Sequence, residues 1–309
     1  MTSMVKQRWT VSGVRNRLRR MTWRGQRIDW SGYILVAPFL TLFVLFNAIA
    51  LLFGLYLSCN EWEVVGRPEW VGLANFREIL ADDLAREAFL NTFRYVLVIA
   101  PGVTIVAFVL ALFVHQQWPG HIVSRAAFFS PVVCAPTAVG LIWVWMLDTQ
   151  FGLINQYLGR LGIPPVPWLT SPDWSWLGVS LMSVWWDTGF SFVLFLAALQ
   201  DVPAELREAA QVDGATRWQV VWNIILPLLR PVTSMVITLQ VIATLRIFSQ
   251  ISVMTQGGPA GSSMSAIMYL YSYGLSRYRF GYASAVAVLL LLATLLITLV
   301  NRWLVKEKV

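Results

Sequence analysis

"YVLVIAPGVTIVAFVLALFVHQQWPGHIVS", residues Tyr95 to Ser124, contains no Asp, Glu, Lys or Arg. A helix of about 20 apolar residues spans the hydrocarbon core of a bilayer, and this run is longer than that. Three further runs also lack these charged residues: Trp30–Asn60, Ala126–Leu147 and Phe280–Asn301. Uncharged runs of this length predict transmembrane α-helices.

The composition of the whole chain agrees with this prediction. Only 13% of the 309 residues are charged and 57% are hydrophobic, whereas a soluble domain carries about a quarter charged residues. Two further candidate spans contain a few charges: Trp174–Gln200 holds Asp187, and Leu228–Met254 holds Arg230 and Arg246. We therefore predict an all-α polytopic membrane protein. Its six transmembrane helices are expected at about 31–58, 91–114, 123–147, 174–200, 228–254 and 280–303.

The basic residues predict the orientation of these spans. Residues 1–30 hold eight Lys or Arg and one acid, which places the N-terminus in the cytoplasm and, with six spans, both termini inside. The predicted inner segments then hold 15 Lys or Arg and the outer loops hold six. The net charge of +7 is thus an orientation signal and requires no nucleic acid. The first apolar run is too long for the about 7–15 residue core of a signal peptide.

This reading divides the chain into three parts. Residues 1–30 form a basic cytoplasmic segment, 31–304 a transmembrane domain, and 305–309 a cytoplasmic tail. Within the domain, Pro131 and Pro136 are expected to kink the third span.

Residues 201–227 interrupt the apolar pattern with a polar inner segment. We predict two short helices, the first capped by Asp201 with Pro203 in its first turn. Gly214 suits the left-handed position that ends such a helix, and Thr216 with Gln219 forms a capping box for the second. Pro227 and Pro231 should then bend the chain as it enters the fifth span. A solvated loop is the simpler alternative, but two capped helices are more typical of a protein-binding surface.

Two charges lie deep within predicted spans. Asp187 is 14 residues from Asp201, and Arg246 is 15 residues from Pro231; both therefore lie roughly 21–23 Å from the inner boundary. We hypothesise that they are neighbours that pair or jointly line a solute path. The alternatives are a purely structural ion pair and snorkelling of Arg246 to the outer surface.

The residues near these charges suit a carbohydrate, because aromatic faces stack on sugar rings and amides or hydroxyls bind sugar hydroxyls. The full set of candidate pathway residues is Trp185, Trp186, Asp187, Gln240, Arg246, Ser249 and Gln250.

The polar inner segment resembles a known motif. Glu208-Ala209-Ala210, Gly214, Ile224 and Leu226-Pro227 have the spacing of the EAA motif in permeases of binding-protein-dependent ABC importers. "WVGLANF" (70–76) and "TQGGP" (255–259) are similar to further motifs of the carbohydrate subfamily, which contains maltose-type and glycerol-phosphate-type permeases. At two positions the chain departs from that pattern, with Gln256 in the usual TGGGP and Ser249 where many relatives have Asp.

The resemblance implies a permease subunit in a bacterial cell (inner) membrane that works by alternating access. The segment 201–227 would be a coupling helix region seated in a separate ATPase subunit. The expected coupling residues are Glu205, Glu208, Ala209, Ala210, Asp213, Gly214, Ile224, Leu226 and Pro227. The partners implied are a second permease subunit, often a different chain, two ATPase subunits and an extracytoplasmic substrate-binding protein. ATP would be bound by the ATPases, so no cofactor is expected in this chain.

Two other function classes are open. A secondary transporter or channel for a polar solute would usually need several intramembrane acids or ion sites, and the spans contain one acid and no repeated halves. A membrane enzyme is disfavoured because the sequence has no HExxH motif and no cluster of acids. It also has no phosphate-binding G-x4-G-K-[ST] motif, so we do not expect the chain to hydrolyse ATP itself. His115 and His121 share one short inner loop and are expected to be solvated.

Overall fold

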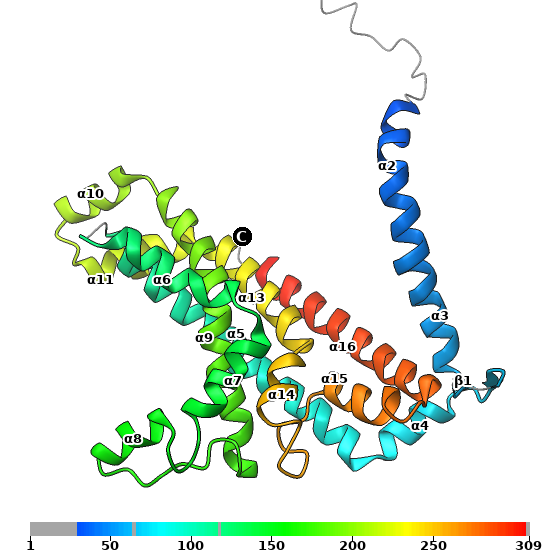
Figure 1. Ribbon diagram of the computed structural model, residues 1–309. Coiled ribbons are helices and arrows are strands. Elements are labelled where there is room, and N and C mark those ends of the chain that lie inside the picture. Colours follow the sequence, from blue (N-terminus) through cyan, green and yellow to red (C-terminus); the bar gives the residue numbers. More distant parts are fainter. Residues whose placement is uncertain (1–29, 64–65, 117–118, 307–309) are drawn as a thin grey trace, which may run out of the picture. The chain divides into compact units, whose positions relative to one another are not determined.

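The computed structural model of this chain describes residues 30–63, 66–116 and 119–306 (Figure 1). The chain divides into two units between Phe53 and Gly54. Of the predicted N-terminal segment 1–30 and tail 305–309, only residues 30, 305 and 306 fall within the described part.

The first unit contains one long apolar helix. It begins as α2 (Trp30–Phe43), passes through the π-helical segment η1 (Val44–Ala48) and continues into α3 (Ile49–Ser58), which crosses the division between the units. Residues 35–58 qualify as a membrane span by length and apolarity, which agrees with the predicted first span.

The second unit is almost entirely helical. Its short strands β1 (Asn60–Glu61) and β2 (Glu69–Trp70) pair antiparallel. The next helices are α4 (Ala74–Ala81), α5 (Asp83–His115), α6 (His121–Val133), α7 (Pro136–Met146), α8 (Leu153–Arg160) and α9 (Pro172–Gln200). The chain then forms α10 (Ala204–Val212), α11 (Arg217–Val220), η2 (Val221–Ile225), α12 (Leu226–Leu228), α13 (Arg230–Leu245), α14 (Ser249–Met254), α15 (Ala266–Tyr269), η3 (Leu270–Leu275) and α16 (Phe280–Lys306).

Four of the described helices are long and apolar enough to cross a membrane: residues 35–58, α5, α9 and Phe280–Val300 of α16. Two bent pairs meet the same test, α6 with α7 and Arg217–Leu228 with α13, which brings the candidates to six if each pair counts as one span. The structure thus confirms a mostly helical protein with several helices that are long and apolar enough to span a membrane. The count of six spans and the location of the termini remain predictions.

The third predicted span, 123–147, is not one continuous helix. It breaks between α6 and α7, which bend by 101°, as the two prolines led us to expect. Because Pro136 disfavours helical backbone in the residue before it, Ala135 adopts φ −59° and ψ 134° and the helix stops.

The fifth predicted span, 228–254, is not one continuous helix, because it is interrupted twice. The first interruption, at Leu229, bends the chain by 69°. Pro231 lacks the N–H that would bind the Pro227 carbonyl and its ring clashes there, so the predicted bend is confirmed. The second interruption, residues 246–248, has no proline or glycine and was not predicted.

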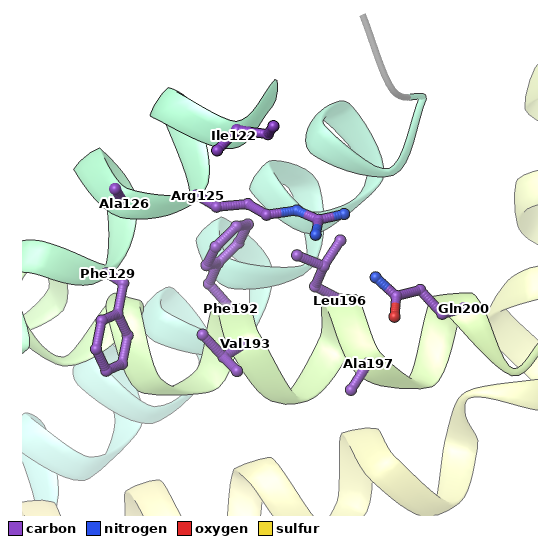
Figure 2. Close-up of a pocket in the computed structure, with 9 residues that line it drawn as sticks. All are labelled: Ile122, Arg125, Ala126, Phe129, Phe192, Val193, Leu196, Ala197 and Gln200. Carbon is purple, nitrogen blue, oxygen red and sulfur yellow. The ribbon is translucent and has the colours of Figure 1, made fainter. Parts of the chain in front are cut away.

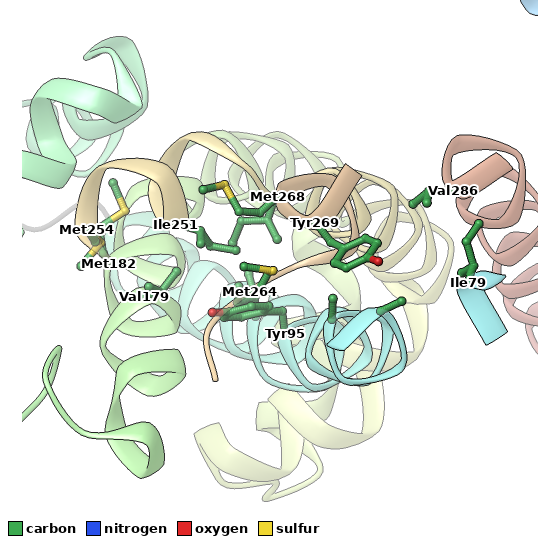
Figure 3. Close-up of a cluster of buried hydrophobic side chains, with 14 of the residues drawn as sticks. Ile79, Tyr95, Val179, Met182, Ile251, Met254, Met264, Met268, Tyr269 and Val286 are labelled. Atoms are coloured by element: carbon green, nitrogen blue, oxygen red, sulfur yellow. The ribbon is translucent and has the colours of Figure 1, made fainter. Parts of the chain in front are cut away.

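Close packing of α5 against α9 forms the centre of the second unit (Figure 1). Both helices bury small side chains, which lets their backbones approach; these include Ala85, Ala88, Ala107 and Ala111 of α5 and Ser175, Ser180, Ser183 and Ser191 of α9. Figure 3 shows the buried cluster that α5 and α9 share with α14 and α15, where Met264 lies close to Tyr95. A second cluster joins the other ends of α5 and α9 to α11, η2 and α13.

The long helix α5 starts well before the predicted residue 91 because Asp82 caps it. Its Oδ1 accepts from the backbone N–H groups of Leu84 at 2.8 Å and Ala85 at 3.3 Å. The Tyr269 hydroxyl donates to Oδ2 at 2.5 Å. Burial opposes a charge on Asp82, but these hydrogen bonds outweigh it and hold the pKa of Asp82 below its ordinary value of 3.8.

Replacing Asp82 with alanine should destabilise the protein by about 1 kcal/mol, the usual loss for an N-cap. A carboxylate whose pKa is lowered on folding contributes stability that is present above the unfolded pKa and lost as pH falls below 3.8 through the folded value. Thermal unfolding of the purified protein between about pH 2 and 5 measures both effects. The control is Asp83→Ala, since Asp83 makes only an exposed ion pair with Arg86 at 2.9 Å and should cost less than about 0.5 kcal/mol. If the unfolding temperature of Asp82→Ala fell with pH as much as that of the parent protein, the stabilising role of the Asp82 carboxylate would be contradicted.

Candidate coupling surface and transport path

Helix α10 ends as the sequence predicted. Gly214 has φ +83°, and the Ala215 N–H donates to the Ala210 carbonyl at 2.9 Å. Such a left-handed ending favours glycine because a side chain there is strained. The predicted N-cap is wrong, however: Asp201 ends α9, and Pro203 occupies the cap position without a side-chain hydrogen bond. Because α10 begins only at Ala204, Asp201 lies too far from its first N–H groups.

The predicted capping box begins the next helix. The Thr216 N–H donates to Gln219 Oε1 at 2.7 Å, and the Gln219 N–H donates to Thr216 Oγ1 at 3.3 Å. From this cap, α11, η2 and α12 run without a break from Arg217 to Leu228. The turn at Gly214 therefore connects α10 to an unbroken helical segment that leads to α13.

The predicted coupling residues fall into two groups. Five of them are exposed: Glu205, Glu208, Ala209, Asp213 and Gly214. The other four, Ala210, Ile224, Leu226 and Pro227, are half-buried, and Ala210 and Ile224 pack on the cluster formed with α5 and α9. The exposed group is available to a partner, while the second group faces the body of the protein. That they contact an ATPase stays a prediction.

Four exposed apolar side chains in the same segment were not among the predicted residues. Leu206 is 43% exposed, Trp222 52%, Trp218 67% and Val212 88%. Exposed apolar residues beside exposed carboxylates are typical of a protein-binding surface. For Leu206 and Val212 the signal in the sequence is the amphipathic pattern of residues 204–212, in which neither residue belongs to the EAA motif.

A polar contact attaches α10 to α5. Arg207 Nη1 lies 2.8 Å from His115 Nε2, and since a guanidinium only donates, this ring nitrogen accepts. The expectation that His115 is solvated is therefore wrong, because it is half-buried beside α10. The two residues are 92 positions apart, and no local pattern in the sequence indicates their contact.

Among the candidate pathway residues, the two tryptophans of α9 differ. Trp185 is 48% exposed, and its ring lies 5.9 Å from that of Trp143 in α7. The half-buried Trp186 donates from Nε1 to the Cys134 carbonyl at 3.0 Å, which satisfies a group freed by the α6–α7 break. Trp185 is thus accessible, whereas Trp186 supports the break.

Arg246 lies in the unwound segment between α13 and α14 and is exposed. The break is stabilised by Ser265, whose hydroxyl donates to the Ile247 carbonyl at 2.7 Å. Asp187 is half-buried. Within the described ranges the side-chain ion pairs are Arg86–Asp83 and Arg279–Glu78, so the hypothesised Asp187–Arg246 pair is not formed. The hypothesis assumed a continuous helix, whereas Arg246 lies in the break between α13 and α14. That both residues line the path stays a prediction.

The remaining pathway candidates are less accessible. Gln240 is buried and donates to Ser191 Oγ at 3.1 Å, which links α13 to α9. Gln250 is also buried and Ser249 is half-buried. In this chain the glutamines contribute to helix packing, and Trp185 with Arg246 forms the accessible part of the predicted set.

Comparison with known proteins identifies the family. The family described as "Binding-protein-dependent transport system inner membrane component" matches residues 22–308. The trehalose/maltose transport system permease protein MalF of Thermococcus litoralis is 33% identical over 78% of this chain and 82% of its own length. The sn-glycerol-3-phosphate transport system permease protein UgpA of Yersinia pestis is 29% identical over 92% of this chain and 97% of its own.

The fold is also that of a solved ABC transporter. A chain of a bacterial ABC transporter involved in the import of the acidic polysaccharide alginate has a TM-score of 0.77 and 22% identity, covering 96% of this chain and 99% of that one. At 22% identity, this structural similarity shows that the two chains share a fold. The match over residues 22–308 and the 33% identity to MalF show that the chain belongs to the binding-protein-dependent transport system inner membrane components.

Proposed function

We propose that this permease carries a sugar or related polar solute inward, driven by ATP that separate ATPase subunits hydrolyse. The observation that carries the proposal is the exposed surface of α10, which ends at Gly214 and is anchored to the body by Arg207. The relatives support it, since their names include trehalose, maltose and glycerol phosphate transport. A related alginate transporter has been solved in complex with its substrate-bound periplasmic protein.

The helices suggest how ATPase movement reaches the solute path. A shift of α10 would pass through the Gly214 turn into α11, η2 and α12, and then through the bend at Leu229 into α13. The far end of α13 is the unwound segment that contains Arg246. Alternating access requires that ATP favour one of two states, and this series of connected helices would transmit that preference.

Transport by the reconstituted complex tests the proposal. The permease, its second permease, the ATPases and the binding protein are placed in liposomes, and uptake of sugars and sugar phosphates is measured. We expect uptake that requires ATP and is unchanged when ionophores collapse ion gradients. Uptake that continues without the ATPases would instead indicate a channel or secondary transporter.

Arg246→Ala tests the solute path. Hydrogen bonds to charged groups contribute about 1.5–3 kcal/mol, so losing one to the solute should lower uptake at least roughly tenfold. Arg230→Ala is the control, because Arg230 is equally exposed but lies at the other end of α13. Unchanged uptake together with a lower unfolding temperature would show that Arg246 has a structural role only.

A further inference from the structure

A cavity of about 500 Å³ lies between α6 and α9, near the end of the molecule that carries α10. Figure 2 shows the Arg125 side chain extending over Phe192 toward Leu196, with Gln200 at the same end. The rest of the lining is apolar and includes Phe129 and Val193. The cavity is separate from the candidate solute path at Arg246.

Arg125 is left without a counter-charge. Its Nε is buried and has no hydrogen-bond partner among the described residues, and no acid in that part of the chain forms an ion pair with it. Arg125 and Arg207 both lie within electrostatic range of His115. Arg125 itself is half-buried. The cavity therefore borders a cluster with excess positive charge, and the buried Nε of Arg125 lacks a hydrogen-bond partner, which is costly.

The polarity of the cavity changes along its length. Gln200 is the last residue of α9, while Val193 lies seven residues earlier, about 10 Å deeper along the helix. On α6, Arg125 lies near the start at His121, and Phe129 lies four residues farther, about 6 Å deeper. The polar end thus lies at the membrane boundary and the apolar end within the membrane. These two ends match the headgroup and the acyl chain of a lipid in one leaflet.

We propose that this cavity binds an anionic phospholipid from the leaflet on the α10 side. The phosphate accepts hydrogen bonds from the Arg125 guanidinium and the Gln200 amide, and the upper part of an acyl chain lies against Phe129 and Val193. A free anion would fill only the polar end, and an acidic protein side chain would leave the apolar end empty. The inference is independent of which solute the permease carries.

Native mass spectrometry of the intact transporter complex tests the site, with phosphatidylglycerol as the probe and phosphatidylcholine as the neutral comparison. We expect retention of phosphatidylglycerol to fall roughly tenfold in Arg125→Gln, since it loses a charge-assisted bond. A second variant, Ala197→Leu, keeps the charge but fills the cavity that Ala197 lines, and retention should fall there too. Ala197→Leu therefore still tests the site if Arg125→Gln misfolds.

The control is Arg230→Gln, which removes an exposed arginine outside the cavity and should retain lipid as the parent does. Equal retention in the parent, Arg125→Gln and Ala197→Leu would overturn the proposal. Displacement by inorganic phosphate alone would identify a free-anion site and also overturn it. Loss of subunit assembly in Arg125→Gln with lipid retention unchanged in Ala197→Leu would identify an acidic protein partner instead.

Discussion

Replacing Gly214 with proline is expected to uncouple ATP hydrolysis from uptake, lowering the solute imported per ATP at least roughly tenfold. Proline fixes φ near about −65°, whereas Gly214 has φ +83°. Proline also lacks the N–H that Gly214 donates to the Gln211 carbonyl at 3.0 Å. The turn between α10 and α11 should therefore re-form with α10 in a different direction. The measurement is parallel uptake and ATPase assays on the reconstituted complex.

Gly162→Pro provides a matched control. Gly162 follows α8 with φ +78°, donates its N–H to Gly159 at 3.0 Å and has free space around it. Proline should therefore strain the backbone at Gly162 about as much as at Gly214. Because Gly162 is far in sequence from the candidate coupling segment, Gly162→Pro should leave the ratio of uptake to ATP hydrolysis unchanged. Gly214→Ala should give an intermediate effect, because an L-residue in this conformation costs about 1–2 kcal/mol without a clash. An unaltered ratio in Gly214→Pro would exclude a coupling role for this turn.

Gly281→Ala is expected to have the largest effect on stability, a loss of about 3 kcal/mol. A Cβ at this position would collide with the carbonyl oxygen of Asn60. That oxygen cannot move freely, because Asn75 Nδ2 donates to it at 2.9 Å. The Gly281 N–H also donates to the Trp62 carbonyl at 3.3 Å, so the start of α16 must shift as well. Thermal unfolding of the purified complex measures the loss.

Gly159→Ala is the control for this substitution. Gly159 lies within α8 and has no neighbour within 4 Å of the added Cβ, so alanine should be neutral or stabilise the helix by up to about 1 kcal/mol. Wild-type stability in Gly281→Ala would mean that α16 does not pack closely on β1.

The local structure of the candidate coupling segment, residues 201–227, was largely predictable because it depends on neighbours in the sequence. The ending at Gly214 and the Thr216–Gln219 box involve residues within a few positions of each other. The prediction that Asp201 caps α10 was wrong for an equally local reason: Pro203 occupies the N-cap position and the helix begins at Ala204. The attachment through Arg207 and His115 could not be predicted, because it joins helices 92 residues apart.

The sequence by itself determined that this is a helical membrane protein, where its continuous apolar helices lie, and the turn that directs its coupling surface. These features follow from uncharged runs, prolines and a glycine, whose effects act over a few residues. Only the tertiary structure decided where α13 unwinds and which charges remain unpaired. The break at 246–248 has no local breaker, and its Ile247 carbonyl is satisfied by Ser265 from a later segment. Whether an interrupted helix is stable depends on such distant partners, because a freed backbone group inside a membrane must find a hydrogen bond within the protein.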